Sequence, residues 1–282
     1  MAGGTESRDE APIACRRVRA SMKLATFLVP GADASLAGEV RGDAVVAFTD
    51  GTTVLQRLAS GDRTPADGSR HALADVTLLA PVPRPRAIFG VGLNYAAHAA
   101  EQGKEPPEQP IIFMKLPTSA APPNGEIACP AVVRRLDYEG ELAVVMGADG
   151  AVAGYAVSDD LSARDLQGRE PQWTRAKGFD ASCPYGPWIT TADEVADPED
   201  LALRTWVNGE LRQDSATSDL IFGIDAVVAF LRETCTLEPG DLILTGTPSG
   251  VGMALDPPRF LESGDVVRIE IEALGAIEHR IA

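Results

Sequence analysis

Short runs of apolar and β-branched residues, separated by glycine and proline, recur along most of this 282-residue chain. Before residue 80 the pattern predicts a small α+β unit over 22–80. Its expected strands are 23–29, 37–41 and 44–48, and its expected helix lies near 52–60. The segment Ala80-Pro-Val-Pro-Arg-Pro-Arg86 follows and predicts a domain boundary, because proline interrupts both helices and strands.

Beyond this boundary the strand-like pattern dominates. The expected strands are 87–91, 111–115, 141–147, 152–158, 203–208, 242–246 and 266–272. Helical spacing is found at 94–103 and at 219–235. Strands do not alternate regularly with helices, so we predict a β-rich α+β fold, with 81–282 as the larger domain.

The first 21 residues are polar and lack the apolar core of a signal peptide. We therefore expect 1–21 to be a disordered leader, or translation to start at Met22. Four cysteines (Cys15, Cys129, Cys183 and Cys235) form no C-x-x-C pair, which favours a reducing cytoplasm over a disulfide scaffold or a zinc site.

Composition excludes two classes of partner. The net charge of −16, from 25 basic and 41 acidic residues, argues against a nucleic-acid surface. No apolar run approaches the roughly 18 residues that a membrane span needs. A small anionic substrate remains compatible, because a metal ion and a few cations can reverse the local field.

The most informative feature is a pair of acids, Glu139 and Glu141, within the largely apolar run 136–146. Residues two apart on a strand project from the same face, so the two carboxylates would repel each other unless a cation joins them. Asp160 follows as a third candidate. Three carboxylates form an all-oxygen site that suits Mg²⁺ or Mn²⁺ better than Zn²⁺. The alternative is the acidic edge of a solvated strand.

Other candidates lie in four segments. His98 and Glu101 are spaced i, i+3 on an expected helix, where a carboxylate can orient an imidazole, although a lone histidine is more often structural. Lys115 and Lys177 lie in apolar or aromatic settings in a chain with only four lysines, and could instead be edge residues. The Gly-rich loop around Thr247 could cradle an anion, but it lacks the Gly-Lys-Ser/Thr of a phosphate loop.

Six motifs together resemble the fumarylacetoacetate hydrolase superfamily over residues 80–282, with most likeness to its short, single-chain acylpyruvate hydrolase and isomerase/decarboxylase members. They are Gly-Leu-Asn-Tyr-Ala-x-His-x-x-Glu, Phe-Met-Lys, Asp-Tyr-Glu-x-Glu-Leu, Asp-Leu-Ser-Ala-Arg-Asp-Leu-Gln, Gln-Trp-Thr-Arg-x-Lys-x-Phe-Asp and Leu-Thr-Gly-Thr-Pro-x-Gly-Val-Gly, in this order. The resemblance implies a mixed β-roll with a small N-terminal domain, typically in a homodimer.

The resemblance also implies a role for each candidate residue. Mg²⁺ or Mn²⁺ would be held by Glu139, Glu141 and Asp160. His98 and Glu101 would activate water or move a proton, with Lys177 as the basic residue near the metal. The implied substrate contacts are Lys115, Gln167 and Thr247.

Three positions depart from the pattern of some members. Asp159 and Leu161 replace the asparagine and the bulky residue that flank the metal-binding aspartate, and Gly168 replaces a larger side chain.

Two enzymatic hypotheses follow from the resemblance. The leading one is a metal-dependent hydrolase that cleaves a C–C bond of a 2,4-dioxo acid through a metal-bound enolate. The alternative is an isomerase or decarboxylase of 2-oxo-dienoate dicarboxylic acids, or an oxaloacetate decarboxylase. A binding module that has lost catalysis is a third hypothesis, and the intact set of candidate residues argues against it.

Overall fold

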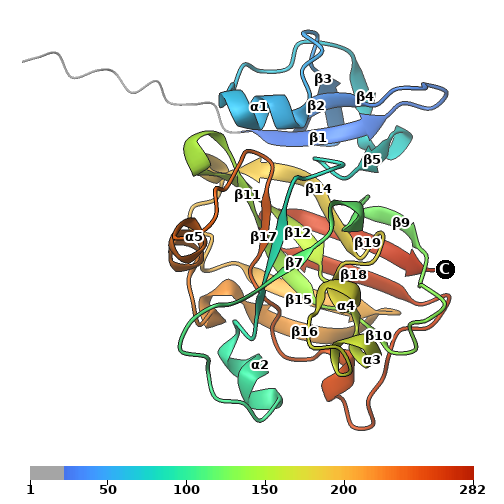
Figure 1. Ribbon diagram of the computed structural model, residues 1–282. Helices are drawn as coiled ribbons and strands as arrows, with labels where there is room; N and C mark the ends of the chain where they lie inside the picture. The colour runs from blue at the N-terminus through green and yellow to red at the C-terminus, as the bar shows by residue number, and fades with distance from the viewer. Residues whose placement is uncertain (1–21) are drawn as a thin grey trace, which may run out of the picture.

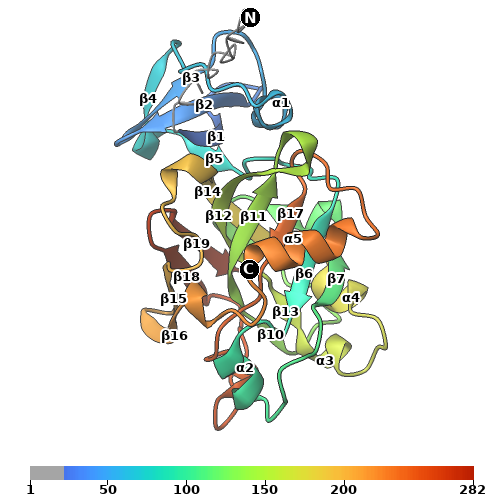
Figure 2. The same ribbon diagram turned by 90° about the vertical axis from the view of Figure 1, so that its left-hand side faces the viewer.

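A computed structural model describes residues 22–282 (Figure 1), so the predicted leader 1–21 lies outside the described residues. The N-terminal strands and one helix gather at one end of the molecule in both Figure 1 and Figure 2. These elements are β1 (Lys23–Leu28), β2 (Leu36–Arg41), β3 (Ala44–Ala47), α1 (Val54–Ser60), β4 (Arg70–Ala72) and β5 (Thr77–Leu79). The strands and the helix that the sequence pattern predicts in this unit are thus confirmed to within two residues.

Local sequence explains why α1 begins and ends where it does. The Thr53 hydroxyl accepts a hydrogen bond from the backbone N–H of Gln56, and Oε1 of Gln56 accepts one from the backbone N–H of Thr53. This reciprocal capping satisfies two N–H groups that the first turn leaves free. Gly61 ends the helix in the left-handed conformation that glycine adopts at little cost.

The large sheet runs through most of the chain in the order β4-β3-β2-β1-β14-β12-β11-β17-β6-β7, with β5 and β8 paired to β1 and β14. Its remaining strands are β6 (Ile88–Gly92), β7 (Ile111–Lys115), β8 (Ala120–Ala121), β11 (Gly140–Met146), β12 (Val152–Asp159), β14 (Cys183–Thr191) and β17 (Leu242–Leu244). Every residue of β11 is buried, as expected for a strand covered on both faces.

A second sheet, in the order β16-β15-β18-β19-β9, packs against the first. Its strands are β9 (Asn124–Ile127), β15 (Ala202–Val207), β16 (Glu210–Ala216), β18 (Val266–Ile271) and β19 (Gly275–Ile281). Leu203, Ile269 and Ile277 from this sheet share one apolar core with Leu142 and Val157 from the large sheet. The architecture is the mixed, β-rich fold that the sequence predicts.

Helices are few and short. They are α2 (Ala96–Glu101), α3 (Arg164–Gln167), α4 (Thr174–Lys177) and α5 (Ile224–Arg232). Short 3₁₀ turns are η1 (Leu73–Asp75), η2 (Pro117–Ser119), η3 (Ala148–Gly150), η4 (Ala192–Glu194), η5 (Thr217–Asp219) and η6 (Gly252–Ala254), and β10 (Leu136–Asp137) pairs with β13 (Ser162–Ala163). No helix within 22–282 is long and apolar enough to span a bilayer.

Candidate active site

Three carboxylates meet where β11 begins and β12 ends. Glu139 directly precedes β11, Glu141 is the second residue of that strand, and both line the same cavity. Asp160 follows β12 directly, and its backbone N–H donates to the Glu139 carbonyl at 2.9 Å. One carboxylate oxygen from each of the three residues lies within 4.8 Å of the others, and all three residues are buried.

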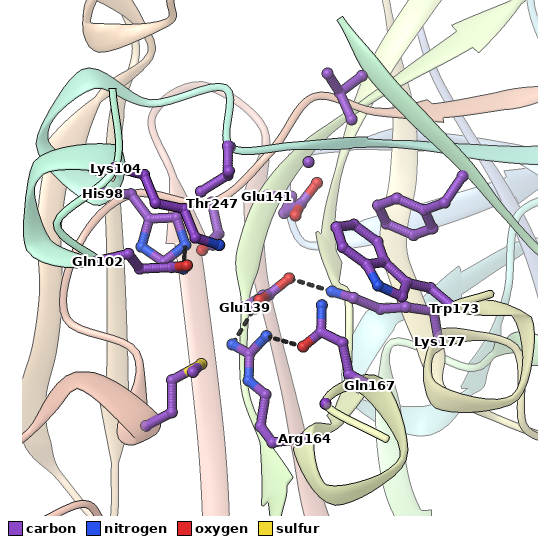
Figure 3. A pocket seen from close by; sticks show the side chains of 16 residues that line it. His98, Gln102, Lys104, Glu139, Glu141, Arg164, Gln167, Trp173, Lys177 and Thr247 are labelled. Atoms are coloured by element: carbon purple, nitrogen blue, oxygen red, sulfur yellow. Dashed lines mark hydrogen bonds and ion pairs between the residues drawn. The ribbon is translucent and has the colours of Figure 1, made fainter. Parts of the chain in front are cut away.

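Three cations are packed against these acids. The Lys177 ammonium lies 2.5 Å from Oε2 of Glu139 and 2.6 Å from Oδ2 of Asp160. Lys115 approaches Asp160 from the other side, with Nζ 2.5 Å from Oδ1, and Arg164 places Nη2 2.5 Å from Oε1 of Glu139. Figure 3 shows Arg164 and Lys177 on either side of Glu139.

The charge is not evenly compensated. Burial would raise the pKa of Glu139, but the Arg164 guanidinium and the Lys177 ammonium lower it below its ordinary range. Burial and the neighbouring charges of Asp160 and Glu139 raise the pKa of Glu141 well above its ordinary value. Glu141 accepts one backbone hydrogen bond, from Gly246 N–H at 2.7 Å, and pairs with no cation among the described residues.

These observations show that the site is suited to a hard divalent cation. The donors are all carboxylate oxygens, they lie close together, and Glu141 is buried without an ion-pair partner among the described residues. The three acids could hold a metal ion together, and its identity as Mg²⁺ or Mn²⁺ stays a prediction.

A short helix faces the carboxylates. His98 on α2 is buried, and its Nδ1 lies 3.0 Å from Oε2 of Glu101. Its Nε2 lies 2.7 Å from the side-chain amide nitrogen of Gln102. The other oxygen of Glu101 accepts a hydrogen bond from the backbone N–H of Gly250 at 2.8 Å. The helix and the Gly-rich loop are therefore joined through the residue that orients the imidazole.

A cavity of about 260 Å³ separates the helix from the acids (Figure 3). His98 and Lys104 line one side, and Glu139, Glu141 and Lys177 line the other. Its apolar wall consists of Val91, Leu93, Phe113, Trp173 and Met253. Gly168 also lines the cavity.

The proposed substrate contacts differ in position. Gln167 lines the cavity, and its Oε1 accepts from Arg164 Nη1 at 3.0 Å. Thr247 lines it too, although its hydroxyl already donates to the Gly140 carbonyl at 3.1 Å. Lys115 is buried against Asp160 and is not among the lining residues, so its contact with substrate stays a prediction.

Sequence reasoning missed two residues of the charge network. Arg164 links Glu139 to Asp137, whose Oδ2 accepts from Nε at 2.8 Å. Asp137 also accepts from the backbone N–H of Gly252 at 2.8 Å. Both residues lie within the quoted motifs. In a continuous strand the spacing 137, 139, 141 would put three acids on one face, which is the sequence signal for Asp137.

Comparison with known proteins assigns the family. The model of the fumarylacetoacetate (FAA) hydrolase C-terminal domain matches residues 87–282. The chain belongs to this family. It is 43% identical over 249 residues to the mitochondrial oxaloacetate tautomerase Fahd2a of Rattus norvegicus, covering 81% of this chain and 79% of the relative.

Two solved structures share the fold over almost the whole chain. A 2-hydroxyhepta-2,4-diene-1,7-dioate isomerase from Mycobacterium marinum is 36% identical with a TM-score of 0.78, covering 93% of this chain and 98% of the other. A fumarylacetoacetate hydrolase from Exiguobacterium antarcticum is 34% identical with a TM-score of 0.84, covering 93% and 99%. Members of one family with this fold thus carry the names of a tautomerase, an isomerase and a hydrolase.

Proposed function

We propose that this chain is a metal-dependent tautomerase that interconverts the keto and enol forms of oxaloacetate. The observation that carries the proposal is the cavity with the His98–Glu101 pair on one side and the carboxylates, Lys177 and Arg164 on the other. The 43% identity to the rat oxaloacetate tautomerase supports oxaloacetate as the substrate.

A divalent cation on Glu139, Glu141 and Asp160 would supply Lewis-acid stabilisation of an enolate and a fixed point for a 2-oxo carboxylate. The side chains of this protein carry out the proton transfer. Tautomerisation moves one proton from C3 of the substrate to the oxygen on C2, and neither water nor a C–C bond takes part. A single group that takes a proton and gives it back is therefore sufficient.

His98 is placed for this proton transfer. Glu101 holds the ring through Nδ1, so Nε2 is the nitrogen available to the substrate once Gln102 moves aside. Lys177 lies on the opposite wall, where its ammonium can stabilise the oxyanion that forms, an effect worth about 3 kcal/mol per donor.

The hydrolase hypothesis has less support. It needs a water activated at Nε2 of His98 in addition to the bound substrate, whereas tautomerisation needs no water. The 43% identical relative is named a tautomerase, whereas the hydrolase structure is 34% identical.

Isomerisation of a 2-hydroxy-dienoate dicarboxylate is the second candidate. The apolar wall of Phe113 and Trp173 would suit the carbon chain of such a substrate, and the M. marinum isomerase shares the fold. Homodimerisation and a cytoplasmic location stay predictions.

The test is tautomerisation of oxaloacetate by the purified protein, followed by the ultraviolet absorbance of the enol. We expect activity with Mg²⁺ or Mn²⁺, loss of activity with a chelator, and recovery when the metal is restored. Glu139→Gln should abolish it, while Glu194→Gln, a surface control, should not. Pyruvate release from acetylpyruvate, or isomerisation of the dienoate, without oxaloacetate tautomerisation would overturn the proposal.

A further inference from the structure

One buried acid beside the carboxylate site takes no part in the proposed chemistry. Asp159, the last residue of β12, is fully buried. Its Oδ1 accepts a hydrogen bond from the backbone N–H of Glu139 at 2.8 Å. The next residue, Asp160, donates its own N–H to the carbonyl of Glu139. The Glu139 backbone is thus held on both sides by consecutive residues of the chain.

The second oxygen of Asp159 faces a histidine from the other sheet. Oδ2 lies 3.0 Å from Nε2 of His279 on β19, and both side chains are fully buried. The contact is at ion-pair distance but is not aligned as a hydrogen bond, and neither atom has another hydrogen-bond partner within residues 22–282.

A buried carboxylate oxygen is costly unless a donor or a positive charge meets it. For Oδ2 of Asp159, the polar group that lies at this distance is Nε2 of His279. Without it, Asp159 would have one oxygen with no polar contact, and the side chain would be free to turn away from the Glu139 N–H.

We propose that His279 is a positioning residue for the carboxylate site, and that it acts on Glu139 through Asp159. The inference rests on the proposed role of Glu139 as a metal ligand. Residues behind the ligands of a metal site commonly alter its affinity by about 10- to 100-fold when they are changed.

Three variants separate positioning from simple packing. His279→Leu removes the donor, His279→Gln places an amide nitrogen close to the position of Nε2, and Ile277→Ala opens a cavity two residues earlier on the same face of β19. Ile277 is also fully buried, so it is a matched control for lost stability.

Two readouts are measured on each protein. The first is hydrogen exchange of the Glu139 amide in metal-free protein, and the second is the dissociation constant for Mn²⁺ by calorimetry. We expect His279→Leu to lose amide protection and to bind Mn²⁺ about 10- to 100-fold more weakly. His279→Gln should stay close to wild type, and Ile277→Ala should lower Tm while leaving both readouts unchanged.

Unchanged exchange and Mn²⁺ affinity in His279→Leu would overturn the inference, as would equal losses in Ile277→Ala. If His279→Leu does not fold, Asp159→Asn and Asp159→Leu decide the matter. The asparagine should keep the protection of the Glu139 amide and the leucine should lose it. Because exchange is read without metal or substrate, this result stands even if oxaloacetate is not turned over.

Discussion

The Arg164 guanidinium lies 2.5 Å from the Glu139 carboxylate, and both side chains are buried. The same guanidinium donates to Asp137 through Nε at 2.8 Å and to Gln167 through Nη1 at 3.0 Å. One planar group therefore joins two carboxylates to a residue of the cavity wall. Only arginine offers donors in such a rigid fork.

Arg164→Lys should therefore be strongly destabilising, although it keeps the charge. A lysine ammonium cannot reach Asp137, Glu139 and Gln167 together, and an unpaired buried carboxylate costs about 3–5 kcal/mol. Denaturant unfolding would measure the loss. Arg175→Lys is the matched control, because its pair with Glu170 is exposed and should contribute less than about 1 kcal/mol. Similar losses in the two variants would contradict this account.

His98→Asn should lower kcat for oxaloacetate by about 10²- to 10⁴-fold, because it removes the group that carries the proton. Binding of Mn²⁺ should be little changed, since His98 is not a ligand. His71→Asn is the control: His71 lies on β4 in the N-terminal unit and contacts Ser69. A fall in Mn²⁺ affinity as large as the fall in kcat would instead assign His98 to the metal site.

Lys104 should select substrates that carry a second carboxylate. It lines the cavity from an exposed position and makes no side-chain ion pair within 22–282. Lys104→Met should raise KM for oxaloacetate by about two- to fivefold, because a partly exposed ion pair contributes about 0.2–1 kcal/mol. KM for a 2-oxo monocarboxylate should not change. Lys23→Met, in β1, is the control, and equal changes for both substrates would argue against this role.

Stability should depend on pH through Glu39 in β2. Burial would raise the pKa of this carboxyl, but the Arg41 guanidinium and the Ala66 N–H lower it below the ordinary 4.5. A lowered pKa means that the ionised form stabilises the fold above about pH 4.5, and that this contribution disappears as pH falls through the lowered pKa. The Tm difference between wild type and Glu39→Gln should thus shrink in acid. Exposed Glu108→Gln should show no such trend.

The sequence predicts strands well where apolar runs are uninterrupted. β1, β2 and β12 lie within a residue of their expected bounds, because alternation and β-branched residues mark them directly. β14 was not predicted, since Pro184, Gly186 and Pro187 interrupt its pattern. Yet β14 pairs with both β1 and β12 and so connects the N-terminal strands to the rest of the large sheet.

The three acids could be predicted because carboxylates are rare in apolar strands. The cationic partners of these acids could not be predicted, because the sequence does not indicate which acid a long arginine or lysine side chain reaches after folding. Arg164, which pairs with Asp137, was not among the predicted site residues. Lys115 was expected to contact substrate, but it is buried against Asp160. The contact between His279 and Asp159 joins two sheets, so no pattern of neighbouring residues in the sequence predicts it.

The parallel pairing of β6 with β17, in which Ile88 lies opposite Leu242, has a consequence for synthesis of the protein. The residues that line the cavity are spread along the sequence from Val91 to Met253. The side formed by Thr247 is therefore missing until the late part of the chain has been made. Until β17 arrives, β6 has only β7 beside it and presents an open hydrogen-bonding edge. Contacts between such distant segments form slowly, which makes the growing chain most prone to aggregate just before it becomes active.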